Sequence, residues 1–310
     1  MAMTRRFNIV LMAALLFIAL PCYWLLFDNR PGDPAPKPVE IAELRTLADS
    51  MPGDKPVAIA LERAAYKLVS GAFLSAGSGL KRRLYSAVAY RLEVPGKGPV
   101  VIDPGMTRAA ARQLEFDRLI PRAQAAIDAA LASASLVLTT SEQPVAASNI
   151  RAGAAVLARI AGKEPQAVAP GVVVIPTGAP TPGSRMIYVA LADGREYLLA
   201  GEVAPLASSF TELRGRPRLM TDHLMPEDRA EAFAWLATIR ALQRQAPGLR
   251  VLPGHDLAWL ASPQRQDWVI KAFPIPAARE QGSGKPSTYP VKGGAKRPQA
   301  ARNSAGQELP

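Results

Sequence analysis

Residues 136–148 read LVLTTSEQPVAAS, and this stretch decides how the fold of the chain is interpreted. Its first three residues, Leu136 to Leu138, form an apolar run of the kind that fills a buried strand. Polar residues end the run at 139–143, and small residues typical of the start of a helix follow. A buried strand that passes through a polar loop into a helix is typical of α/β proteins.

The same alternation of strands and helices continues on both sides of this stretch. Short apolar or β-branched runs predict strands, and longer stretches with one apolar face predict helices. Asp193-Gly194 lies between two apolar runs, where this dipeptide is a strong signal for a β-hairpin. A hairpin inside an alternating pattern predicts mixed sheets. Strands are expected at 100–102, 136–139, 172–175, 186–191, 196–199 and 249–252, and helices at 122–132 and between Pro226 and Pro247.

The N-terminal region contains an uncharged apolar run from Phe7 to Phe27. As a helix it would span roughly 31 Å, close to the thickness of a bilayer core. Cleaved signal peptides have shorter apolar segments of about 7 to 15 residues and end at a small-residue site, so we favour an uncleaved anchor. A lipoprotein-type cleavage before Cys22 is the other alternative, although Pro21 is unfavourable there.

Charges beside this run predict its orientation. Arg5 and Arg6 precede it and Asp28 follows it. The positive-inside rule then places residues 1–6 in the cytoplasm, 7–27 across the inner (plasma) membrane as a single pass, and the main domain in the periplasm or its equivalent. Cys22 is the only cysteine of the 310 residues, so the exported part has no disulfide, no thiolate nucleophile and no cysteine ligand for zinc.

Composition divides the exported part into three segments. Residues 28–55 are rich in proline near their start and are expected to be an extended spacer. Residues 56–273 carry the strand and helix patterns, and 274–310 are predicted to be a disordered basic tail because large apolar residues are few. The net charge of +11 draws on this tail and on Lys81-Arg82-Arg83. It indicates either solvated surface charge, which we favour, or contact with anionic lipid, and no nucleic-acid motif is present.

The motifs VVIDPG (100–105), VLTTSEQPVAAS (137–148), IPTGAPTPGSRMIYVALADGREYLLAGE (175–202) and VLPGHD (251–256) follow one another in the order seen in a known family. Together they resemble the metallo-β-lactamase-fold hydrolases over roughly residues 56–273. The resemblance implies an αββα sandwich, in which two mixed β-sheets pack face to face and helices cover their outer faces. It also implies that the loops at 139–148, 177–184, 200–202 and 253–256 converge on one edge of the sandwich.

The resemblance also identifies where this chain departs from the family. The family binds zinc through histidine and aspartate residues, and most of these ligands are replaced here. Only a glutamate and the last histidine could still bind a metal, and two ligands are too few for a hydrolytic zinc site. We therefore expect no zinc. The former ligand positions are occupied, in chain order, by Ser141, Gln143, Val145, Ala146, Pro180, Glu202 and His255.

The remaining polar residues each allow two interpretations. Asp103 is either a carboxylate near the site or, as we favour, part of an ordinary Asp-Pro-Gly turn. His255 is either a general base beside Glu202 or, as we favour, a histidine that binds loop carbonyls. Burial should raise the pKa of Glu202 unless His255 pairs with it. His223 is expected to be a surface or loop-packing residue.

Three functions are compatible with the sequence. The favoured one is a membrane-anchored pseudoenzyme that binds a small ligand or a protein partner. The second is a metal-independent hydrolase with Ser141 as nucleophile and His255 and Glu202 in support, although no Gly-x-Ser-x-Gly elbow surrounds Ser141. The third is a structural envelope protein that acts through its anchor and basic tail.

Overall fold

The computed structural model describes residues 3–150 and 160–273. The N-terminal helix α1 (Met3–Cys22) continues as a short π-helix, η1 (Tyr23–Phe27). Within the helical run Thr4–Phe27, the most apolar 18-residue stretch has a mean hydropathy of 2.5 and is not buried, so the run is long and apolar enough to cross a membrane. The tail predicted at 274–310 lies outside the described residues.

Two mixed β-sheets form the centre of the domain. In the first sheet the strand order is β11-β1-β2-β3-β5, and β4 also pairs with β1. In the second sheet the order is β10-β9-β8-β7-β6. The first comprises β1 (Ala58–Ser70), β2 (Arg82–Glu93), β3 (Val100–Ile102), β4 (Arg118–Leu119), β5 (Leu136–Leu138) and β11 (Ile270–Lys271). The second comprises β6 (Gln166–Ala169), β7 (Val172–Pro176), β8 (Arg185–Ala190), β9 (Glu196–Gly201) and β10 (Arg250–Pro253).

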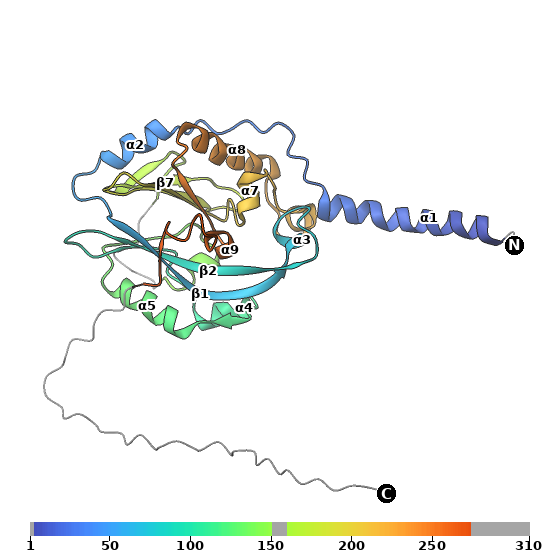
Figure 1. Cartoon of the computed structure of the whole chain (residues 1–310), viewed down its shortest axis with the longest axis horizontal. Coiled ribbons are helices and arrows are strands. Elements are labelled where there is room, and N and C mark those ends of the chain that lie inside the picture. The colour runs from blue at the N-terminus through green and yellow to red at the C-terminus, as the bar shows by residue number, and fades with distance from the viewer. Residues whose placement is uncertain (1–2, 151–159, 274–310) are drawn as a thin grey trace, which may run out of the picture. The chain divides into compact units, whose positions relative to one another are not determined.

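Helices cover the outer faces of both sheets, which makes the αββα sandwich that the resemblance implies (Figure 1). On the second sheet lie α2 (Ile41–Asp49), α7 (Ala207–Thr211) and α8 (Arg229–Gln245). On the first sheet lie α4 (Arg108–Gln113) and α5 (Pro121–Ala132). Four short elements complete the described chain: α3 (Gly71–Leu74), α6 (Pro144–Ala147), η2 (Leu219–Leu224) and α9 (Leu257–Leu260).

Strand β7 shows why a central strand of this sandwich has an unbroken run of apolar residues in the sequence. Its side chains alternate between the two faces of the sheet. Val172 and Val174 belong to the core between the sheets, whereas Val173 and Ile175 belong to the core under the helices. Because both faces are covered, every position is apolar, as expected for a strand buried on both sides.

Residues 28–55 differ from the extended spacer expected from their composition. They contain α2, which packs its apolar face against the second sheet and α8. Leu44 is fully buried and Ile41 and Ala48 are nearly so. The prolines that suggested a spacer lie before the helix, at 31–38. The folded domain therefore begins before residue 41 rather than at 56.

Candidate functional site

The four loops singled out in the sequence meet at one edge of the sandwich, as expected. Two glycines allow the closest approaches. A Cβ atom on Gly201 would lie 2.5 Å from Cβ of Thr140, and one on Gly254 would lie 2.3 Å from the carbonyl oxygen of Gly201. Gln143 Nε2 also donates to Thr181 Oγ1 at 3.2 Å. Residues from distant parts of the chain thus form one polar site.

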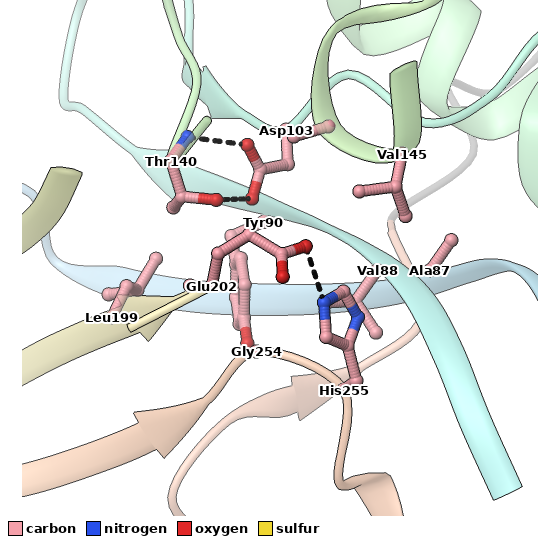
Figure 2. Close-up of a pocket in the computed structure, with 12 residues that line it drawn as sticks. Ala87, Val88, Tyr90, Asp103, Thr140, Val145, Leu199, Glu202, Gly254 and His255 are labelled. Carbon is pink, nitrogen blue, oxygen red and sulfur yellow. Dashed lines mark hydrogen bonds and ion pairs between the residues drawn. The ribbon is translucent and has the colours of Figure 1, made fainter. Parts of the chain in front are cut away.

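His255 and Glu202 form the centre of this site (Figure 2). The Nδ1 atom of His255 lies 2.8 Å from the carbonyl oxygen of Ser86, which can only accept, so Nδ1 carries a hydrogen. The Nε2 atom lies 2.9 Å from Oε1 of Glu202. The ring therefore binds a loop carbonyl, as favoured from the sequence, and also contacts the carboxylate of Glu202, while a general-base role for His255 stays a prediction.

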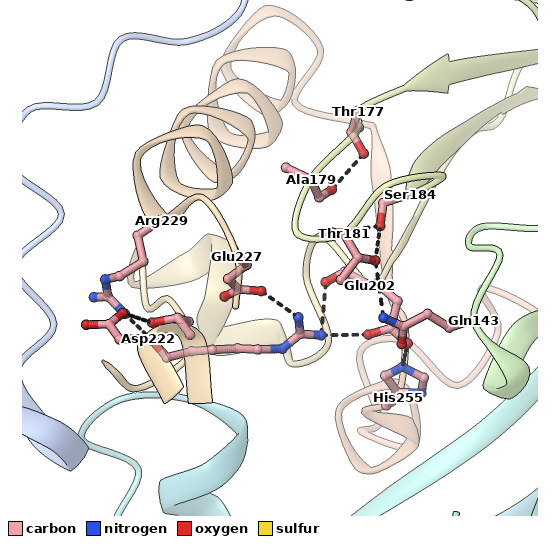
Figure 3. Close-up of polar contacts among 12 residues, drawn as sticks. Gln143, Thr177, Ala179, Thr181, Ser184, Glu202, Asp222, Glu227, Arg229 and His255 are labelled. Carbon is pink, nitrogen blue, oxygen red and sulfur yellow. Dashed lines mark hydrogen bonds and ion pairs between the residues drawn. The ribbon is translucent and has the colours of Figure 1, made fainter. Parts of the chain in front are cut away.

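Arg216 occupies the other side of Glu202. Its guanidinium donates to Oε2 of Glu202 at 2.6 Å and to Oε2 of Glu227 at 2.9 Å. The side chains of both glutamates are at most 5% exposed. Figure 3 shows Glu227, Glu202 and His255 along one line of polar contacts. We call the four residues Glu227, Arg216, Glu202 and His255 the buried ionic chain.

The charges of the buried ionic chain explain its pKa values. Burial alone would raise the pKa of Glu202, but the neighbouring His255 and Arg216 outweigh it and hold the value at about 2. An ionised Glu202 keeps one carboxylate oxygen 2.9 Å from Nε2 of His255 and the other 2.6 Å from the guanidinium of Arg216. Burial raises the pKa of Glu227, although Arg216 opposes this shift. From the sequence we expect burial to raise the pKa of Glu202 unless His255 pairs with it. His255 does pair with Glu202, and the pKa of Glu202 is lowered rather than raised.

Two further residues border the buried ionic chain. The ring of Tyr85 stacks on His255 with centroids 3.9 Å apart, and its hydroxyl lies 2.9 Å from Nε2. Burial raises the pKa of this hydroxyl well above its usual range. Asp103 faces the same space but accepts hydrogen bonds from the amide and the hydroxyl of Thr140, both at 2.7 Å. Asp103 thus ties the loop after β3 to the loop after β5.

The other positions at which the resembled family has metal ligands do not contribute to the buried ionic chain. Ser141 is fully buried, and its Oγ accepts from the amide of Gln143 at 2.9 Å. Both nitrogens of His255 have other partners, so the arrangement does not present Ser141 to His255 as a serine hydrolase requires. Val145 and Ala146 lie against the pocket, and their side chains are apolar. Pro180 has no side-chain atom that could bind a metal and no N–H that could donate a hydrogen bond.

His223 and Asp222 lie away from this site. His223 is exposed on η2, as expected. Asp222 is exposed too, accepts from Thr221 Oγ1 at 2.6 Å and pairs with Arg218.

The residues of the site do not fit the zinc ions that the fold family implies. Oε1 of Glu202 is bonded to His255 and Oε2 to Arg216, so a zinc ion would have to displace a guanidinium. The cation beside the carboxylate already supplies the positive charge that a metal would bring. Within residues 3–150 and 160–273 there is no group of three or more His, Cys, Asp or Glu that could hold a metal. That the protein carries no zinc stays a prediction.

The space left between these side chains is small. The pocket lined by His255, Glu202, Asp103 and Tyr90 has a volume of about 10 Å³, room for about one water molecule. A larger groove of about 530 Å³ lies beside the 177–184 loop and is lined by Trp235, among others. A ligand larger than a water molecule would fit the groove and not the pocket beside His255.

Sequence reasoning missed Arg216, Glu227 and Tyr85. One signal could have pointed to a cation. A buried carboxylate without a metal needs a positively charged partner, and Arg214, Arg216 and Arg218 follow Glu202 closely in the chain. Nothing in the sequence selects one arginine among the three.

Comparisons with known proteins support the fold. No protein-family model matches the chain, and a search of the curated proteins found no match. Solved structures do match. A quorum-quenching N-acyl homoserine lactone lactonase is 13% identical, with a TM-score of 0.51 over 66% of this chain and 94% of its own. An N-acyl homoserine lactone hydrolase with N-hexanoyl-L-homoserine bound at its catalytic metal centre is 12% identical, with a TM-score of 0.50 over 65% and 94%.

A third match is a B. thuringiensis AiiA variant with N-decanoyl-L-homoserine at its active site. It is 13% identical, with a TM-score of 0.51 over 65% of this chain and 94% of its own. Identities this low show a shared fold and leave activity open. The two mixed sheets, the outer helices and these matches agree with the resemblance seen in the sequence. The described domain has the αββα fold of the metallo-β-lactamase-like hydrolases.

Proposed function

We propose that this protein is a membrane-anchored pseudoenzyme, a metallo-β-lactamase-fold domain that binds a small ligand or a protein partner and does not hydrolyse through zinc. The buried ionic chain is the observation that carries the proposal. In it a guanidinium 2.6 Å from Glu202 takes the place of a metal's charge, and both carboxylate oxygens are used. A hydrolytic zinc ion needs about three protein ligands and one open position, and this site offers neither.

The sizes of the two cavities near the site favour ligand binding over catalysis. The former metal pocket holds about one water molecule, whereas the groove beside Trp235 has about 530 Å³. This groove combines an apolar ring with the charged side chains of Lys163, Arg185 and Glu142. Small-molecule sites commonly combine an apolar lining with a few polar groups. The anchor Thr4–Phe27 would hold the domain outside the cytoplasm, at the membrane.

Metal analysis of the purified full-length protein tests the proposal. We expect well under one zinc per chain after dialysis, and no chelator-sensitive hydrolysis of lactone, lactam or phosphodiester substrates. Missing ligands forfeit much of the roughly 10 to 16 kcal/mol apparent for complete structural zinc sites. One tightly bound, chelator-sensitive zinc per chain would refute the proposal.

A gain-of-ligand variant tests the role of Arg216. Five substitutions restore the family's ligands: Ser141→His, Gln143→His, Val145→Asp, Ala146→His and Pro180→His. We expect zinc binding to return only when Arg216→Met is added, because the guanidinium competes for Glu202. Equal zinc binding with and without Arg216 would show that the guanidinium does not stand in for a metal.

A further inference from the structure

The end of the apolar helix is fastened to the folded domain. Asp28, whose side chain is fully buried, accepts from Arg218 Nε at 3.0 Å. The guanidinium carbon of Arg218 lies 4.1 Å from the centroid of the Trp24 ring. A buried charge pair and a cation–π contact therefore join residues at the end of the helix to the start of η2.

A second set of contacts comes from the backbone. Gly77 donates its amide hydrogen to the carbonyl of Leu26 at 3.2 Å. Gly215 donates to Oδ1 of Asn29 at 3.0 Å, and Asn29 donates to the carbonyl of Leu213 at 3.0 Å. Residues 26–29 are thus bound by two loops, which limits how far the domain can swing about the helix.

Large apolar side chains are exposed on the elements that hold this junction. Leu80 is 73% exposed, Leu224 59% and Phe73 40%. Leu80 follows Gly77 by three residues and Phe73 precedes it by four, so both lie within roughly 14 Å of the junction. Leu224 is the last residue of η2, and Arg218 directly precedes this short helix. Single exposed apolar residues are common, but these gather on segments next to a candidate membrane helix.

Basic side chains complete this surface. Lys81, Arg82 and Arg83 directly follow Leu80, and all three are exposed. None of the ion pairs formed among the described residues involves them. We call Phe73, Leu80, Leu224 and Lys81–Arg83 the anchor-side face. Apolar side chains beside unpaired cations are the combination that binds the interface of an anionic bilayer.

We propose that the anchor-side face lies in the headgroup region of an anionic phospholipid bilayer and holds the domain flat against it. This inference rests on the proposed insertion of Thr4–Phe27. The fastened junction keeps the face beside the membrane, so contact needs little additional ordering of the chain. Neutral lipid would satisfy the apolar side chains but not the three cations.

Fluorescence quenching in proteoliposomes tests this surface with the full-length chain. Cys22 is the only cysteine, so labelling it in the unaltered protein reports insertion of the helix. In a Cys22→Ser background, single variants Leu80→Cys and Leu224→Cys report the anchor-side face. Ile270→Cys, at an exposed position on β11, is the control. Each label is exposed to nitroxide lipids in vesicles containing phosphatidylglycerol or phosphatidylcholine alone.

We expect quenching of the labels at 22, 80 and 224 in phosphatidylglycerol vesicles and none at 270. Quenching at 80 should weaken in phosphatidylcholine, or when Lys81, Arg82 and Arg83 are all changed to Gln. Quenching at 22 without quenching at 80 and 224 would overturn this inference and leave the anchor intact. No quenching at 22 would overturn the anchor as well. Blue-shifted labels at 80 and 224 without quenching would mean that protein, rather than lipid, covers the face.

Discussion

At the scale of single residues, Arg216 is the side chain on which the buried ionic chain most depends. It neutralises two nearly buried carboxylates, Glu202 and Glu227. Removing one partner of a buried charge cluster costs about 3–5 kcal/mol, because the remaining charge is left without compensation. We therefore expect Arg216→Met to lower the thermal unfolding midpoint of the detergent-solubilised protein by roughly 6–20 °C.

The matched control is Arg195→Met, which breaks the exposed pair with Asp193. Exposed pairs contribute at most about 1 kcal/mol, so its midpoint should fall by no more than about 4 °C. The triple variant Arg216→Met, Glu202→Gln, Glu227→Gln should recover most of the loss, since the two carboxylates that Arg216 neutralised then carry no charge. A loss as large in the triple variant as in Arg216→Met would show that packing, and not charge, explains the effect.

Asp103 makes the stability of the domain depend on pH. Burial raises its pKa to about 7, although the hydrogen bonds from Thr140 oppose the shift. A carboxyl whose pKa is higher in the folded than in the unfolded state binds more protons when folded. Its contribution to stability is therefore lost as the pH rises from about 4 through 7. Between pH 5 and 7 we expect a loss of about 2 kcal/mol.

The variant Asp103→Asn tests this pH dependence. Asparagine tolerates the left-handed backbone of this position, where φ is 53°, and it does not titrate. The midpoint difference between pH 5 and pH 7 should shrink in the variant relative to the unaltered protein. Glu202, with its pKa near 2, contributes stability above about pH 4 that is lost only as the pH falls towards 2. An unchanged pH dependence in Asp103→Asn would assign the effect to another group.

At the scale of elements, α2 is the part whose role is least evident from composition. It is a nine-residue helix that follows a proline-rich segment, yet Leu44 is fully buried against the second sheet. We expect Leu44→Ala to cost about 2–5 kcal/mol, because the helix cannot fill the cavity left behind. Thr46→Ala, at an exposed position of the same helix, should be nearly neutral. Thermal unfolding of both variants measures the difference, and equal midpoints would place α2 outside the cooperative domain.

Local patterns predicted most elements and failed at particular ones. Asp193-Gly194 predicted the β8–β9 hairpin, and the apolar run at 172–175 predicted β7. The long pair β1 and β2 was missed because charged residues such as Glu62, Arg63 and Lys67 interrupt the alternation, and a register shift lies after Arg63. The loop convergence was predictable only through the resemblance, since no local pattern brings residue 140 to residue 201. The pairing of Arg216 with Glu202 was not predictable from a local pattern either, because it forms where these loops converge.

At the scale of the whole molecule, the junction between Asp28 and Arg218 joins the candidate membrane helix to the domain, so the orientation of the helix also decides on which side of a membrane the domain lies. The run Thr4–Phe27 has arginines only at its start, Arg5 and Arg6. Positive charge favours the cytoplasmic side, so the domain should lie outside. We expect the full-length protein to stay in the membrane fraction after alkaline carbonate extraction, with its mass unshortened. A cleaved signal sequence would instead release a soluble, shorter product.

Two reporters fused after residue 273 separate the possible orientations. A phosphatase that folds only outside the cytoplasm should be active, and a reporter active only in the cytoplasm should be silent. Reversing the charge with Arg5→Glu and Arg6→Glu should move part of the population to the opposite orientation, because the positive charge of these two arginines favours the cytoplasmic side. In that inverted fraction the contact between Asp28 and Arg218 would still form, since both residues follow the helix and lie on the same side of the membrane. A cytoplasmic reporter that is active in the unaltered protein would therefore refute the orientation without refuting the anchor or its attachment to the domain.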